Sequence, residues 1–248
     1  MAGRSALTLG AEQVAYLQNL GVNPTDDATK YSWDRAVESR IEAIFTAEAG
    51  FLEGNSSVQN IDTAGIILSA TSFYAEAGGQ VADSGFLTVT LANGKKASFE
   101  VLDVQVYGGF VLHTCSLIDN SGEDDTPVLT QLLPRGSPVL VQVDYSRRRK
   151  VAPNHTMTHV LNYALRKELP ENTIDQKGSL VNEEKLRFDF SLNRSLQPDE
   201  LQSVEDTVNK IILSELTVDS KVVPLKEALG INGLRAVFGE AANLYLLL

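Results

Sequence analysis

Between Val58 and Asp144, hydrophobic residues come in short runs that turn residues separate. Runs such as GFLTVTL and ASFEVLDVQV are rich in β-branched and aromatic residues, a composition that favours strands. Asn93-Gly94 lies between these two runs and supplies the positive φ angles that a tight hairpin needs. Short, evenly spaced strands of this kind predict a small β-barrel, and the acidic, proline-containing stretch 118–138 predicts an exposed connection between two of them.

The flanking regions have a different pattern. Residues 9–52 contain two helix-compatible stretches, AEQVAYLQNL and WDRAVESRIEAIFTAEAG, around a polar turn at 23–27, and we read them as helix with loop. After Asp144 the pattern predicts a helix at about 154–168, a strand LRFDFS, a helix at about 198–216 and a short strand SKVVPL.

These elements predict an α+β protein. Its parts are a helical segment at 1–55, a β-barrel lobe at 56–146, a two-layer α+β lobe at 147–240 and a tail at 241–248.

Composition narrows the class of protein. A length of 248 residues with 43% hydrophobic content is enough for one large domain or two small ones. The formal net charge of −11 argues against a protein that coats nucleic acid through bulk positive charge, and we expect no DNA partner. The chain's one cysteine, Cys115, excludes an internal disulfide and fits a reducing compartment, with the cytoplasm as default and an organelle interior still open. No stretch is apolar enough for a signal peptide or a membrane span, so we expect a soluble protein without a membrane partner.

His155 and His159 stand four residues apart on the helix predicted at 154–168. At this spacing the two imidazoles project within about 40° of each other and can bind the same Zn²⁺. An equally weighted alternative is that one histidine caps or packs while the other is solvated. A zinc protease of the H-E-x-x-H type is excluded, because Thr156 stands where that motif has its catalytic glutamate.

A polar segment with paired glycines runs from Thr71 to Gly85. A tight bend at Gly78-Gly79 can present Thr71, Glu76 and Gln80 to a ligand. On the residues alone, a β-bulge or hairpin with solvated polar side chains is the favoured interpretation.

The chain has one dense basic run, Arg147, Arg148, Arg149 and Lys150, directly before the histidines. It would suit a phosphate chain that approaches a metal there, and a solvated basic turn explains it equally well. Farther on, Gln176 to Val181 (QKGSLV) has the composition of a polar turn.

Together and in this order, these pieces resemble the editing domain of alanyl-tRNA synthetases and of free-standing proteins related to it. The resemblance runs from about Thr25 to about Glu240. The elements that carry it are Thr71, Phe73-Tyr74-Ala75-Glu76, Gly78-Gly79-Gln80, Asp83, Gly85, Gly108-Gly109 with Val111-Leu112-His113, Asn154-His155-Thr156, Thr158-His159, Gln176 to Val181, Leu186 to Phe190 and Gly233 to Phe238.

The resemblance implies a β-barrel and an α+β lobe that hydrolyse Ser-tRNA(Ala) and Gly-tRNA(Ala) made in error during protein biosynthesis. It implies that His155 and His159 are zinc ligands, with a cysteine and a histidine farther along the chain completing the site. Thr71 and Gln80 would contact the misplaced amino acid, with Glu76 beside them, and the tRNA acceptor end would be the partner. Residues 1–55 would join the ligase half, which uses ATP and Mg²⁺ in the full-length parent, to the editing half.

The sequence departs from that family after Glu240, where it continues as AANLYLLL without the cysteine and histidine of the pattern. We therefore expect a chain truncated at both ends, with weak or absent zinc binding and weak or absent editing. Whether it is an enzyme stays open at this point. The alternatives are a non-catalytic module that binds tRNA or a full-length synthetase, an inert truncated product, and a complete deacylase whose missing ligands come from a partner.

Overall fold

A computed structural model describes residues 7–52, 63–90, 94, 96–118, 134–170, 174–217, 220–222 and 245–247. The chain forms two compact units. One unit comprises Met1–His159 with Thr173–Ser191, and the other comprises Val160–Asn172 with Leu192–Leu248. Among the described residues, no helix is long and apolar enough to cross a membrane.

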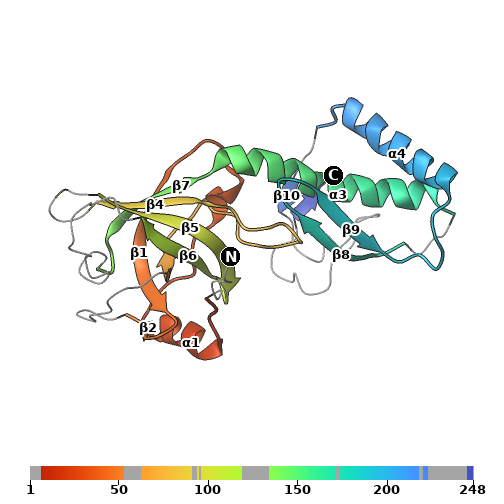
Figure 1. The fold of residues 1–248 in the computed structure, drawn as a ribbon. Helices are drawn as coiled ribbons and strands as arrows, with labels where there is room; N and C mark the ends of the chain where they lie inside the picture. The colour runs from red at the N-terminus through yellow and green to blue at the C-terminus, as the bar shows by residue number, and fades with distance from the viewer. Residues whose placement is uncertain are drawn as a thin grey trace. The chain divides into compact units, whose positions relative to one another are not determined.

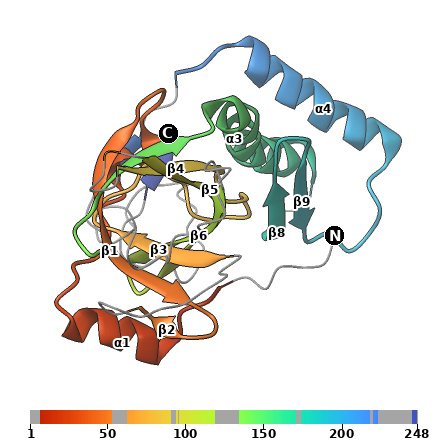
Figure 2. The ribbon, with the colours of Figure 1, turned by 60° about the vertical axis from the view of Figure 1, so that its left-hand side comes forward.

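An antiparallel barrel dominates the first unit. Its strands follow the order β1-β3-β6-β5-β4-β7, and pairing of β7 with β1 closes the ring (Figure 2). Closure leaves no unpaired edge among these strands. They are β1 (Val37–Thr46), β3 (Ala64–Leu68), β4 (Gly85–Thr90), β5 (Lys96–Tyr107), β6 (Phe110–Ile118) and β7 (Pro138–Val143). The predicted barrel and the α+β class are confirmed, while much of the connection predicted at 118–138 lies outside the described residues.

Strand β1 closes the barrel, and the helix predicted for this stretch is wrong. Its first half pairs with β7 and its second half with β3. The register shifts between Ile41 and Ala43, which interrupts the alternation of buried and exposed side chains that marks a strand. The barrel thus takes a strand from the segment predicted at 1–55.

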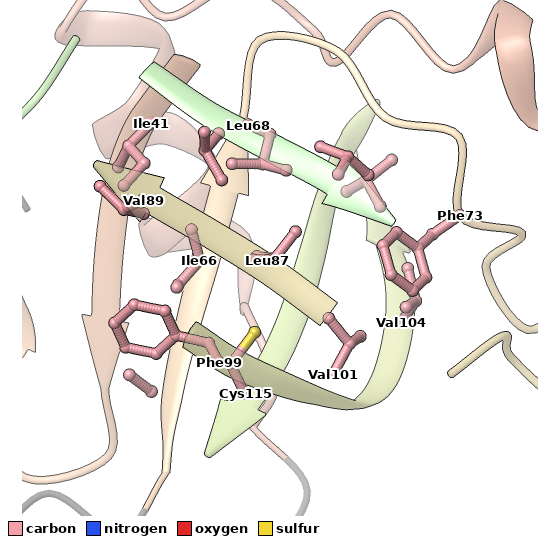
Figure 3. Packing of buried hydrophobic residues seen from close by; sticks show 14 of the residues in the cluster. Ile41, Ile66, Leu68, Phe73, Leu87, Val89, Phe99, Val101, Val104 and Cys115 are labelled. Carbon is pink, nitrogen blue, oxygen red and sulfur yellow. The ribbon is translucent and has the colours of Figure 1, made fainter. Parts of the chain in front are cut away.

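The barrel interior is packed with side chains rather than hollow. Along β4, Leu87 and Val89 point inward and are buried, whereas Phe86, directly before Leu87, is 46% exposed. Figure 3 shows these two residues meeting Ile66, Phe99 and others from the neighbouring strands. Each fully buried side chain of this size contributes about 1.5–3 kcal/mol through the apolar area it removes from water.

A helix covers part of the outer barrel wall. The predicted N-terminal helix is confirmed as α1 (Ala11–Asn19), which lies near the short strand β2 (Gly50–Phe51) (Figure 1). Leu17 of α1 is fully buried and shares a second apolar cluster with Ile67 of β3. Because both faces of β3 are covered, all five of its residues are buried. A 3₁₀ turn, η1 (Ala28–Tyr31), follows α1 in the chain.

After the barrel, the first unit continues with α3 (Tyr145–Glu168) as far as His159 and with a hairpin of β8 (Gln176–Val181) and β9 (Leu186–Phe190). Helix α3 begins well before the predicted Asn154, because Pro153 does not break it. The polar turn predicted for QKGSLV is wrong, since these residues form β8 and pair with the predicted strand LRFDF.

The second unit contains the end of α3, helix α4 (Pro198–Leu213) and the strand pair β10 (Ser220–Val222) with β11 (Tyr245–Leu247). The predicted second helix is confirmed, and Pro198 and Glu200 in its first turn suit a helix start. The Thr207 hydroxyl of α4 donates to the Glu168 carboxylate at 2.6 Å and fastens α4 to the end of α3. Most of the predicted tail at 241–248 lies outside the described residues.

Candidate functional site

The glycine bend and strand β8, which lie far apart in the sequence, meet in the first unit. Backbone hydrogen bonds join Val81 N to Val181 O at 3.0 Å and Val181 N to Gly79 O at 2.7 Å. Gly79 has a φ of +81°, and a Cβ atom there would come within 2.5 Å of the Ser179 carbonyl oxygen. Only glycine permits this conformation and this approach of two backbones.

Gln80 connects the bend to helix α3. Its side chain is buried, at 4% exposure, and its Oε1 lies 2.9 Å from His155 Nδ1. An amide oxygen only accepts hydrogen bonds, so Nδ1 of the neutral ring carries the proton and Nε2 keeps its lone pair. Gln80 therefore fixes the tautomer in which His155 Nε2 can bind a metal or accept a proton.

Gly78 borders the Nε2 edge of His155. A Cβ atom at Gly78 would lie 3.2 Å from Cε1 and 3.3 Å from Nε2. A larger side chain would crowd this edge of the ring, so the glycine leaves Nε2 uncovered.

The second predicted histidine stands beside the first. The rings of His155 and His159 are 6.0 Å apart and inclined by 12°. Burial lowers the pKa of His155 and the nearby His159 lowers it further; burial also lowers the pKa of His159. Both imidazoles are thereby favoured in the neutral form that binds metals.

Among the described residues, no group of three or more His, Cys, Asp or Glu side chains lies close enough together to hold a metal ion. A metal at this site would therefore have two protein ligands from the described residues, the imidazoles of His155 and His159. The chain's remaining histidine and its cysteine, His113 and Cys115, are buried in barrel strand β6. Burial raises the pKa of the Cys115 thiol and so disfavours the thiolate that binds zinc.

Thr71 belongs to a closed network in the barrel. It is fully buried, its backbone N–H donates to Asp26 O at 2.8 Å, and its hydroxyl lies 2.8 Å from His113 Nε2. His113 Nδ1 donates to Ile66 O at 3.0 Å, so Nε2 accepts from Thr71, whose oxygen accepts the Phe73 N–H in turn. Burial lowers the pKa of His113 to about 4, which keeps this network uncharged.

Glu76 points to the barrel strand β5. Its carboxylate accepts a hydrogen bond from Gln105 Nε2 at 3.0 Å, and its backbone N–H donates to Val104 O. Of the three residues predicted on the bend, Gln80 is the one that contacts the histidine pair.

The basic run divides over different faces of α3, because successive helical residues point about 100° apart. Arg149 and Lys150 are exposed. Arg147 donates to Ala82 O at 2.7 Å and lies 3.3 Å from the Glu183 carboxylate. The burial of Arg148, at 4% exposure, is the feature that sequence reasoning missed.

Arg148 uses all five of its N–H donors inside the protein. Nε and Nη2 bond to the buried Asp83 carboxylate, and Nη2 also donates to Ser72 O at 2.5 Å. Nη1 donates to Lys30 O and Ser32 O at 3.0 and 3.2 Å. Asp83 accepts the Tyr74 N–H as well, so this ion pair fastens α3 to the segment that leads into the glycine bend. Asp83 carried part of the family resemblance, but no local pattern pairs it with an arginine so distant in sequence.

Comparison with known proteins defines the class first. A family model described as tRNA synthetases class II (A) matches residues 5–132, and the chain belongs to this class. Within it, the chain belongs to the alanyl-tRNA synthetase family. It is 42% identical over 240 residues to the cytoplasmic alanine–tRNA ligase of Dictyostelium discoideum. The aligned region covers 94% of the chain and 23% of that relative. It is 40% identical over 240 residues to the alanine–tRNA ligase of Schizosaccharomyces pombe, with 96% and 23% covered. It is also 40% identical over 238 residues to the mitochondrial enzyme of Saccharomyces cerevisiae, with 94% and 22% covered.

The chain thus spans less than a quarter of the length of these relatives. Their names include both cytoplasmic and mitochondrial forms, so the cytoplasmic location expected from the sequence stays a prediction.

Proposed function

We propose that the site formed by the glycine bend, His155, His159 and β8 hydrolyses the ester bond between tRNA(Ala) and a wrongly attached serine or glycine. The observation that carries this proposal is the 2.9 Å hydrogen bond from His155 to the buried Gln80. It supports a role in binding or catalysis because it leaves His155 Nε2 as an uncovered acceptor next to Gly78. The membership of the alanyl-tRNA synthetase family supports tRNA(Ala) as the substrate.

The residues fit half of a zinc site. His155 and His159 would hold the ion in their neutral forms, and Zn²⁺ bound there would polarise the ester or activate a water. With two protein ligands known, we expect the affinity to be lower than that of a four-ligand site.

Selectivity between serine and alanine would require a polar partner for the serine hydroxyl. The Gln80 amide is the nearest candidate, because its NH₂ group stays available when Oε1 accepts from His155. A polar group that serine satisfies and alanine leaves unpaired discriminates far better than a difference of one methylene.

The test is the rate at which the purified chain releases serine from Ser-tRNA(Ala), with Ala-tRNA(Ala) as the comparison substrate. We expect faster release from Ser-tRNA(Ala), and a loss of at least about 100-fold in the His155→Ala, His159→Ala variant. Tyr163→Ala is the matched control, since it removes an exposed ring from the same helix and should leave the rate unchanged. Binding of tRNA without hydrolysis would refute the hydrolase and leave a non-catalytic tRNA-binding module. Equal rates for the double variant and the wild type would place the chemistry elsewhere.

A further inference from the structure

A shallow hollow of about 440 Å³ lies on the first unit, lined by Trp33, Arg149, Ala152, Pro153 and Thr156. Trp33 is the chain's one tryptophan, and it is 46% exposed. The Arg148 guanidinium lies 6.0 Å from the centre of its ring and the Tyr145 ring 6.2 Å from it, so the exposed part of the Trp33 ring is what a ligand in the hollow can meet.

Helix α3 forms the floor of the hollow. Arg149, Ala152, Pro153 and Thr156 recur at the i, i+3, i+4 and i+7 positions that share one helix face. His155, directly before Thr156, projects about 100° farther around the same helix. A ligand that fills the hollow and continues around α3 therefore reaches the histidine pair.

The lining suits an unpaired nucleotide. The Trp33 ring and the apolar Ala152 and Pro153 can cover a base, the Arg149 guanidinium can meet a phosphate, and the Thr156 hydroxyl can bond to a sugar. A volume of this size lies in the range of sites for small ligands, about 300–1,000 Å³.

The charges around the hollow favour a phosphate over a neutral ligand. Arg149 is exposed and supplies the positive charge among the side chains that line the hollow. Arg149 pairs with Asp34, but both side chains are more than half exposed, so the pair is weak and screened by salt. The Asp34 carboxylate would repel a phosphate bound to Arg149. Asp34 also has a φ of +54°, a left-handed conformation that aspartate and asparagine both tolerate.

We propose that this hollow binds one unpaired nucleotide of an RNA strand, with its base stacked on Trp33 and a phosphate on Arg149. This inference rests on the proposed function, which identifies the RNA strand as the single-stranded acceptor end of tRNA. The terminal ester of that strand would then lie at His155 and His159.

Trp33 makes the experiment direct, because the fluorescence of a single tryptophan reports on its own ring. The 248-residue chain is titrated with a single-stranded RNA tetranucleotide, with free AMP and with a blunt RNA duplex. Saturable quenching by the tetranucleotide, weaker quenching by AMP and little by the duplex are expected. Quenching by AMP that equals that of the tetranucleotide would overturn the RNA strand in favour of a free nucleotide.

Variants assign the contacts, and the anisotropy of a labelled tetranucleotide measures affinity independently of Trp33. Trp33→Ala should weaken binding by about 5- to 100-fold, and Trp33→Phe should restore most of it. Asp34→Asn should tighten binding by up to about fivefold, because it removes a repelling charge. A merely structural role of Trp33 and Asp34 predicts no gain in affinity for Asp34→Asn. Undiminished binding by a folded Trp33→Ala variant would overturn the proposal.

The hydrolysis assay separates this proposal from the proposed function. Stacking on Trp33 without hydrolysis would leave the nucleotide site in place and refute the hydrolase. Hydrolysis that is insensitive to Trp33→Ala, with no quenching, would refute the nucleotide site alone.

Discussion

Two histidine environments of the first unit differ in how many of their ring nitrogens are used. His113 is fully buried in the barrel, donates to Ile66 O and accepts from Thr71, so neither nitrogen is available. His155 is partly buried, donates to Gln80, and keeps Nε2 beside a glycine. The first arrangement stabilises the barrel; the second leaves an acceptor for a ligand.

The same contrast holds for two neighbouring arginines. Arg148 places every N–H on an internal acceptor, whereas Arg149 is exposed and pairs with one exposed carboxylate. The side chains whose hydrogen-bonding groups all have partners inside the protein stabilise the fold. The side chains that keep a hydrogen-bonding group for a ligand carry the proposed functions. Substituting side chains of both kinds therefore tests the comparison, because each substitution should affect either stability or binding.

The largest effect is expected for Arg148→Met. Removing the guanidinium leaves Asp83 buried without its counter-charge, which should lower the free energy of unfolding by about 3–5 kcal/mol. Denaturant unfolding measures the loss. Arg149→Met is the matched control and should cost less than about 1 kcal/mol, because its ion pair is exposed. Similar losses in the two variants would contradict the structural role of Arg148.

The next effect is an acid sensitivity caused by His113. Its pKa is about 4 in the folded chain and ordinarily about 6.5, so the unfolded state binds a proton first as the pH falls. This contribution to stability is complete above about pH 6.5 and decreases by about 3 kcal/mol in total down to about pH 4. The free energy of unfolding, measured across this pH range, should decrease less steeply for His113→Gln, because glutamine does not titrate. Parallel curves for variant and wild type would exclude His113 as a cause.

Much of the barrel could be predicted because the local sequence of most of its strands has a pattern typical of strands. Strand β4 alternates between buried and exposed side chains, and the run that forms β5 carries the β-branched and aromatic residues that favour strands. Strand β1 was missed because a register shift hides its alternation and its charged residues are compatible with a helix. Strand β8 was missed because its glycine and serine resemble a turn, although pairing with β9 holds them extended.

The candidate site could be predicted only in part, for a similar reason. Helical spacing alone places His155 near His159, and the two rings do stack. No local pattern links Gln80 to His155 across 75 residues; their pairing depends on the close approach of the bend and β8 at Gly79. Nor can a run of basic residues reveal that Arg148 is the buried one, since that depends on which helix face meets Asp83.

His113 has partners at both ring nitrogens, whereas His155 keeps Nε2 available. The most direct test of this contrast is a Zn²⁺ titration of the chain. We expect a single Zn²⁺ per chain, a loss of binding in His155→Ala, and an affinity reduced by about 10- to 100-fold in Gln80→Leu, which no longer orients the ring. His113→Gln should bind zinc as the wild type does. Zinc binding that survives in His155→Ala, or that disappears in a folded His113→Gln variant, would contradict the assignment of His155 as the available ligand.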